Sequence, residues 1–147
     1  MFKKILVAVD GSKYSNHAVE VAVDLAKRYQ TTVLLLHVIR NLSLPEEILE
    51  MMARGEVTES RLELLQDSAE IILDNAREKF VQAGLPVEKS EFIIGPPAST
   101  IASYGEENGA DLIILGHRGI SSEGEELLGG VARKLTNISR ISCLVVK

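Results

Sequence analysis

The stretch Asp111–Ala132, DLIILGHRGISSEGEELLGGVA, decides the fold and contains the strongest candidate site. Its apolar run, residues 112–115, stops at Gly116, and helical spacing resumes only after Gly129 and Gly130. Glycine lets backbone N–H groups approach a ligand closely, and the first turn of a helix attracts negative charge. Because α/β proteins bind anions at this succession of strand, loop and helix start, we expect any phosphate site to lie here.

The glycine spacing differs from two common phosphate-binding motifs. No lysine follows the glycines, as it does in a phosphate loop, and the compact G-x-G-x-x-G fingerprint of dinucleotide-binding proteins is absent. The chain instead has Gly116-x-x-Gly119, nine further residues and then Gly129-Gly130. Since glycines also mark ordinary loops and helix ends, a plain connection is the alternative interpretation.

Composition predicts a single domain over residues 1–147, because 46% hydrophobic content in a chain of 147 residues is enough for one core. The 16 basic and 21 acidic residues give a net charge of −5, which argues against binding of nucleic acid or of an anionic membrane. The single cysteine, Cys143, excludes an intramolecular disulfide and favours a reducing, cytoplasmic location. The early apolar run, residues 5–9, is too short for a signal peptide or a membrane span.

Apolar runs and helical periodicities alternate along the chain. The expected strands cover residues 4–9, 31–39, 87–94, 112–115 and 142–147. The expected helices cover residues 14–29, 58–83, 98–108 and 130–139, and Pro45 could open a short helix to Met52 that Gly55 closes. The alternation predicts an α/β fold with a doubly wound five-stranded parallel sheet, right-handed crossovers and strand order 3-2-1-4-5.

This strand order brings two distant loops together. Ligands of such sheets bind where the strand order reverses, at the carboxyl ends of the first and fourth strands. These strands are expected to end at Val9 and Leu115, so that residues 10–12 face residues 116–119 across one crevice. Either Ser12 or Ser15 is available to cap the helix that follows the first strand.

Several stretches together resemble the universal stress protein family. They are the opening KKILVAVDGS, the strand VLLLHVI, the glycine spacing with Val131 after it, and the final CLVVK. The resemblance runs through the whole chain in order. It implies a Rossmann-like, adenine nucleotide alpha hydrolase-like fold and a cytosolic homodimer that pairs through the last strand. In one branch of the family it also implies ATP or another adenine nucleotide in the crevice.

The resemblance also implies which residues would contact that nucleotide. The adenine and ribose would lie against Ala8, Val9, Asp10 and Val38, with Leu115 and Gly116 closing the site. The phosphates would meet the backbone amides of Gly119, Gly129, Gly130, Val131 and Ala132, with Arg118 beside them. Asp10 could instead be a plain strand-end residue that begins a turn.

Three departures from the nucleotide-binding branch bear on how tightly a nucleotide would bind. Gly130 stands where that branch has Ser or Thr, and losing the hydroxyl hydrogen bond, on the order of 1 kcal/mol, weakens binding roughly fivefold to tenfold. The loop between the glycines also carries three acidic residues, Glu123, Glu125 and Glu126. Within a Debye length of about 8 Å they would repel a triphosphate unless a divalent cation such as Mg²⁺ bridges them. They could equally belong to a solvated loop that points away from the site. Ala8 stands where some relatives carry proline, and a small residue there still leaves room for a ring.

Three functions therefore compete: a nucleotide-sensing regulatory module, a stress-response interaction protein that binds no nucleotide, and a phosphoanhydride hydrolase. We do not expect an enzyme, because no phosphate-loop lysine or Ser-His-Asp set is present, although weak ATP hydrolysis stays open. His117 and Arg118 are expected to be exposed loop residues, and His37 a hydrogen-bonded core or crevice residue. Since the histidines, His17 included, lack partners at ligand spacing, no metal site is expected.

The last strand bears on the oligomeric state. It is expected at the edge of the sheet, where its apolar residues 144–146 would leave an unpaired edge that natural proteins usually cover. Antiparallel pairing with a second copy would cover it and produce a twofold dimer. Cys143, on the same strand, has no activating base nearby in sequence and is expected to be a small core side chain.

Overall fold

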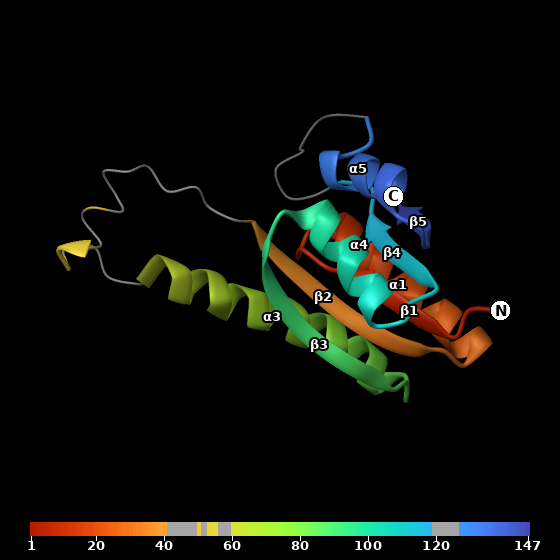
Figure 1. Cartoon of the computed structure of the whole chain (residues 1–147). Helices are drawn as coiled ribbons and strands as arrows, with labels where there is room; N and C mark the ends of the chain where they lie inside the picture. The colour runs from red at the N-terminus through yellow and green to blue at the C-terminus, as the bar shows by residue number, and fades with distance from the viewer. Residues whose placement is uncertain (41–49, 51–52, 56–59, 119–126) are drawn as a thin grey trace.

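The computed structural model describes residues 1–40, 50, 53–55, 60–118 and 127–147 (Figure 1). Its strands all run parallel in one sheet of order β3-β2-β1-β4-β5, which confirms the predicted α/β topology. In chain order the elements are β1 (Lys4–Ala8), α1 (Lys13–Tyr29), β2 (Thr32–Arg40), α3 (Ser60–Gln82), β3 (Val87–Gly95), α4 (Pro97–Glu107), β4 (Leu112–Gly116), α5 (Gly130–Ile138) and β5 (Ser142–Val146).

The predicted elements match these bounds to within one or two residues at each end. The short helix expected from Pro45 to Met52 falls almost entirely on residues outside the described ranges. None of the helices in the described part of the chain has the length and apolar composition needed to cross a bilayer.

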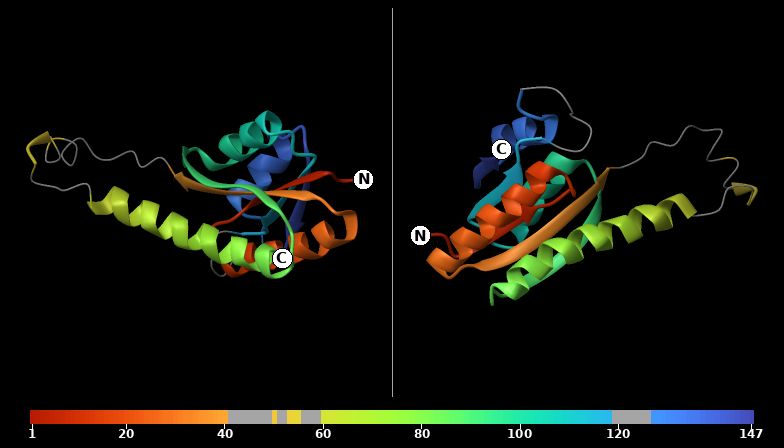
Figure 2. Two further views of the ribbon diagram at one scale, coloured as in Figure 1. Left: turned by 90° about the horizontal axis from the view of Figure 1, so that it is seen from below. Right: turned by 180° about the vertical axis from the view of Figure 1, so that it is seen from behind.

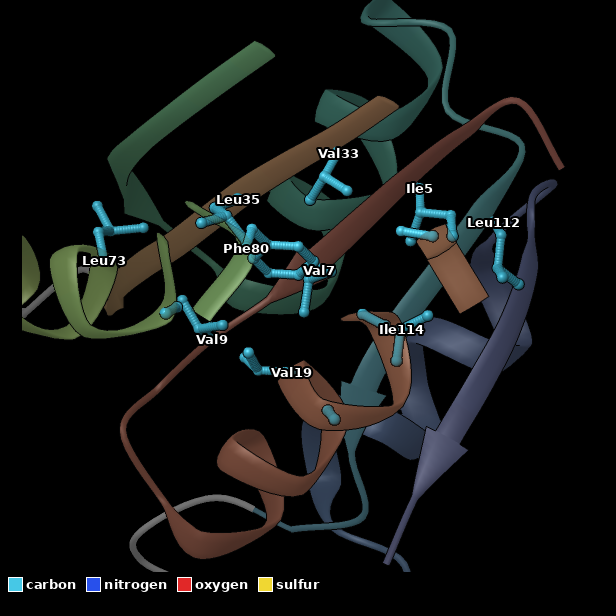
Figure 3. Packing of buried hydrophobic residues seen from close by; sticks show 14 residues of the cluster. Ile5, Val7, Val9, Val19, Val33, Leu35, Leu73, Phe80, Leu112 and Ile114 are labelled. Atoms are coloured by element: carbon cyan, nitrogen blue, oxygen red, sulfur yellow. The ribbon is translucent and has the colours of Figure 1, made fainter. Parts of the chain in front are cut away.

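Two helical layers cover the sheet, with α1 and α3 on one face and α4 and α5 on the other, as the left view of Figure 2 shows. On the first face, Phe80 of α3 and Val19 of α1 point toward side chains of β1 and β2 such as Val7 and Leu35 (Figure 3). The central strands are apolar on both faces because both are covered; Ile5, Leu6 and Val7 are each 0% exposed. Burial of each such side chain stabilises the fold by about 1.5–3 kcal/mol.

Helix α3 extends past the carboxyl edge of the sheet (Figure 1). From Ala69 onward α3 buries Ala69, Leu73, Ala76 and Phe80 against the sheet, at steps of three and four that continue back through residues 65 and 62. Leu62 belongs to the same spacing but is 43% exposed, because the sheet ends before it does. The amino half of α3 is therefore placed beside the strand tips rather than over the sheet.

Side-chain bonds hold the opposite, amino edge of the sheet. The carboxylate of Asp111, which precedes β4, accepts hydrogen bonds from the backbone N–H groups of Lys3 and Lys4 at 2.8 and 3.2 Å. The Lys4 ammonium lies 3.0 Å from the Glu88 carboxylate on β3, across the intervening β2. Glu88 is the residue left between paired positions where the β2–β3 register shifts.

Candidate functional site

One cavity of about 490 Å³ lies at the carboxyl ends of β1, β2 and β4, bounded by residues of all four described helices. The predicted site residues that the structure describes all line this cavity: Ala8, Val9, Asp10, Val38, Leu115, Gly116, Arg118, Gly129, Gly130, Val131 and Ala132. The predicted convergence of the loops after β1 and β4 is therefore confirmed. Gly119 and the acidic residues Glu123, Glu125 and Glu126 lie outside the described residues.

Gly116 fixes how closely β4 approaches α1. A Cβ atom added at Gly116 would lie 2.8 Å from the carbonyl carbon of Tyr14 and 2.9 Å from the backbone nitrogen of Ser15. Only glycine fits here without moving a backbone, and this contact brings the first turn of α1 against the tip of β4. At Gly130, by contrast, an added Cβ would have nothing within 4 Å.

The turn after β1 is held by its own side chains. Asp10 Oδ1 accepts a hydrogen bond from the Ser12 N–H at 2.9 Å, and Ser15 Oγ accepts one from the Asp10 N–H at 3.0 Å. Ser12 is the N-cap of α1, and its Oγ accepts from the Ser15 N–H at 3.1 Å. Asp10 thus has the turn-forming role that the sequence left as an alternative, and this role occupies Oδ1.

The first turn of α5 supplies the polar end of the cavity. The Gly129 N–H donates to the His117 carbonyl at 2.9 Å. This amide therefore fixes the loop and is not available to a ligand. The next three N–H groups, those of Gly130, Val131 and Ala132, have no acceptor among the described residues. Three backbone donors and the positive end of the helix dipole therefore border the cavity.

His117 and Arg118 were expected to be exposed, and this prediction is wrong. They are only 8% and 7% exposed. The His117 N–H donates to the Val146 carbonyl of β5 at 2.6 Å, and its ring lies 5.8 Å from the ring of Tyr14. Burial, with the nearby Arg118 and Lys147 charges, lowers the pKa of His117. This loop residue can be buried because both of its backbone groups are hydrogen-bonded: its N–H to Val146 and its carbonyl to the Gly129 N–H.

Arg118 joins the two sides of the glycine loop. Its Nε donates to the Leu127 carbonyl at 2.9 Å, and its own carbonyl accepts from Ser12 Oγ at 3.4 Å. The side chain also lines the cavity. One arginine therefore links the loop end before α5 to the cap of α1.

Comparison with known proteins establishes the family. The model of the universal stress protein family matches residues 1–147. The chain belongs to this family. Universal stress protein YxiE of Bacillus subtilis is 36% identical over an alignment of 158 positions that covers 100% of both chains.

Solved structures of universal stress proteins share the fold. Protein MJ0577, from Methanocaldococcus jannaschii, matches with a TM-score of 0.83 and 28% identity over 100% of this chain and 96% of its own. UspA of Lactobacillus plantarum matches with a TM-score of 0.80 and 26% identity over 99% and 97%. More distant matches include a complex with cAMP at 22% identity and TM-score 0.72, and the Archaeoglobus fulgidus protein in complex with dAMP at 19% and 0.70.

In this universal stress protein the cavity also contains residues that sequence reasoning did not assign to the site. They are Ser15, Leu36, Ile39, Arg40, Leu65, Ser68, Pro97, Ile101 and His117, together with His37. His37 was expected in the core or the crevice, and its Nδ1 lies 2.7 Å from the Val9 carbonyl, which confirms that prediction. The one available signal was a polar residue within the apolar run of β2.

Cys143 of this universal stress protein lies on β5 and is partly buried against the second core cluster, as expected of a small core side chain. Its Sγ is 3.5 Å from the Ile141 carbonyl, and burial raises the pKa of the thiol. Within the described ranges, no three His, Cys, Asp or Glu side chains gather as metal ligands would.

Proposed function

We propose that this universal stress protein is a regulatory module that binds ATP or another adenine nucleotide in the cavity at the carboxyl ends of β1 and β4. The observation that carries the proposal is the combination of apolar strand tips at one end of the cavity and three acceptor-free amides of α5 at the other. An adenosine group fits the first environment, because Ala8, Val38 and Leu115 present apolar surface. A phosphate fits the second.

The size and charge of the cavity support the same proposal. A volume of about 490 Å³ is in the range of small-molecule and cofactor sites. The Arg118 side chain adds a cation on the side where α5 begins. Relatives with the same fold have been solved in complex with cAMP and with dAMP, so adenine nucleotides occupy this fold in other proteins.

We propose that the module works by binding rather than by turnover. No lysine is among the described residues that line the cavity. Asp10 Oδ1 and His37 Nδ1 are already engaged by the Ser12 N–H and the Val9 carbonyl, so these two atoms are not available to a substrate. Nucleotide occupancy would instead change how partner proteins recognise the turn after β1 and the start of α5. We propose that the protein is cytoplasmic and that Mg²⁺ screens the charge of a bound triphosphate.

The alternative is a homodimeric interaction protein that binds no nucleotide. Gly130 favours it, because the hydroxyl of the nucleotide-binding branch is missing. β5 favours a dimer, because among the strands that the structure describes it stands at the end of the sheet and pairs with β4 alone. Its outer backbone groups are thus available to a second copy. Sedimentation that detects only monomer at micromolar concentration would contradict the dimer. Nucleotide in a native mass spectrum of protein purified without added ligand would contradict the alternative.

Restoring the missing hydroxyl tests the proposed function directly. Since an added Cβ at Gly130 meets nothing within 4 Å, both Gly130→Ser and Gly130→Ala should fold normally. If a phosphate lies at α5, the serine hydroxyl adds one hydrogen bond of about 1 kcal/mol and tightens ATP binding roughly fivefold in calorimetry. The alanine variant is the matched control and should bind like the original chain. No binding or melting shift with millimolar ATP, ADP or AMP plus magnesium would remove the proposal.

A further inference from the structure

Strand β3 forms the edge of the sheet opposite β5. Among the strands that the structure describes it pairs with β2 alone, so the backbone groups on its outer side have no ladder partner there. Within the described ranges, no backbone group of residues 87–95 forms a hydrogen bond outside this ladder. The pairing with β2 is regular from Lys89 to Gly95. An uncovered, regular edge of this kind is a template for another strand.

Lys89 and Glu91 give this edge its charge pattern. Both residues are exposed, and both lie on the face that α4 covers, like the β2 residues with which they pair. Each side chain is held in place by one hydrogen bond. The Lys89 ammonium donates to Asn108 Oδ1 at 2.7 Å, and Glu91 Oε1 accepts from the Tyr104 hydroxyl at 2.6 Å. Lys89 keeps two further N–H donors and Glu91 keeps Oε2, so each can still meet an opposite charge.

The order Lys89-Ser90-Glu91 is complementary to itself about a twofold axis through Ser90. When two copies of a strand pair antiparallel about an axis perpendicular to the sheet, directly opposite residues share a face. Lys89 then faces Glu91 of the second copy, and Glu91 faces the Lys89 of that copy. An axis through Lys89 or through Glu91 would instead place like charges opposite each other, which is unfavourable. Only the axis through Ser90 forms two ion pairs.

Helix α3, on the other face of the edge, is compatible with such a pair. It packs against both β2 and β3, so its axis lies between these strands. Because neighbouring strands are about 4.8 Å apart, the α3 helices of two copies would lie about 10 Å apart, which is a normal helix packing distance. Lys79 of α3 meets Glu20 of α1 at 3.7 Å, and Val81 lies about 200° further round the helix. Val81, which is 55% exposed, is therefore on the side away from α1, where the second copy would pack.

We propose that β3 is a self-association edge, through which two copies of the chain pair antiparallel about Ser90 with two Lys89–Glu91 ion pairs and contact between their α3 helices. No residue of β3 lines the cavity, so this surface does not depend on nucleotide binding. It also lies at the opposite end of the sheet from β5. A chain that pairs through both edges would form assemblies larger than a dimer.

Sedimentation velocity of charge variants tests the ion pairs. Over roughly 10 µM to 1 mM, the range of weak interfaces, the original chain should show a concentration-dependent doubling of mass. Lys89→Glu makes both pairs like-charged, so the concentration at which the mass doubles should rise at least about tenfold. Adding Glu91→Gln removes the repulsion and keeps an acceptor for Tyr104, so about half of that loss, on a logarithmic scale, should be recovered. Lys27→Glu, at an exposed position of α1, makes the same change in net charge and should leave the doubling unchanged.

Cysteine cross-linking tests the register without any change of charge. In a Cys143→Ser background, Ser90→Cys places two thiols opposite each other at the axis, so mild oxidation should produce a disulfide-linked dimer. Ile94→Cys is the matched control, because residue 94 lies on the same face of β3 and is 45% exposed. In the proposed register the two copies of residue 94 are about 26 Å apart along the strands and should not cross-link.

Each result bears on the proposal. A chain that stays monomeric up to about 1 mM has no such interface. A mass doubling that Lys89→Glu leaves unchanged belongs to another surface, such as β5, and overturns the pairing through β3. Cross-linking of Ile94→Cys as fast as that of Ser90→Cys would overturn the register about Ser90.

Discussion

Replacing Gly116 by alanine should disturb both the fold and the cavity. The new Cβ would lie 2.8 Å from two atoms of Tyr14 and 2.9 Å from the Ser15 nitrogen. For the closest contact to reach the 3.4 Å of ordinary van der Waals distance, α1 must move by about 0.6 Å relative to β4. Because two of these atoms belong to the backbone, no side-chain rotation can relieve the clash.

The expected cost of Gly116→Ala is that of overpacking a well-packed site, about 1–3 kcal/mol in the free energy of unfolding. For a chain of this length this corresponds to a melting temperature lowered by roughly 2–12 °C, measured by far-UV circular dichroism. The same displacement moves the turn after β1 away from the tip of β4. ATP affinity should therefore fall even at temperatures where the variant is fully folded.

Gly130→Ala is the control for Gly116→Ala, since it adds the same methyl group at the same cavity without a contact. It should melt at or slightly above the temperature of the original chain, because alanine is a better helix residue than glycine. If Gly116→Ala melts like Gly130→Ala, the close approach of β4 and α1 does not exist in solution, and the account of the cavity given above is refuted.

Ser12→Ala removes the cap of α1 and the bond to the Arg118 carbonyl, so urea denaturation should show a loss of about 1 kcal/mol; an unchanged midpoint would contradict it. Burial, helped by the 2.6 Å hydrogen bond to Glu91, raises the pKa of Tyr104 above its ordinary 10.0. Since the folded state then keeps the phenol proton longer than the unfolded chain, stability falls above about pH 10, and Tyr104→Phe should lessen that fall between urea titrations at about pH 9 and 11. Because burial raises the pKa of the Cys143 thiol, iodoacetamide should alkylate the native protein more slowly than the urea-unfolded protein, and equal rates would speak against this burial.

The sheet could be predicted from the sequence because its signals are local. Unbroken apolar runs such as residues 33–36 mark strands covered on both faces, and intervening helical spacing leaves few parallel topologies. The strand order then placed Asp10 opposite Gly116 without any knowledge of side-chain contacts, and the cavity confirms it.

The parts that could not be predicted depend on contacts between distant residues. Arg118 is buried because its Nε reaches the Leu127 carbonyl, and no periodicity in the loop encodes that bond. The Gly129 amide is taken by the His117 carbonyl, which a glycine count cannot show. Leu65 and Ser68 reach the cavity only because α3 extends past the sheet, a matter of where the strands end.

The bonds at the amino edge have a mechanical consequence for the whole molecule. Asp111 ties β4 to the residues that open β1, and Lys4 ties β1 to β3, so the strands are clamped at the edge remote from the cavity. A ligand that forces the carboxyl ends of β1 and β4 apart would rotate the two strands about this fixed edge. Displacement then grows with distance from the clamp and is largest in α1 and α5, the helices that start beyond the tips.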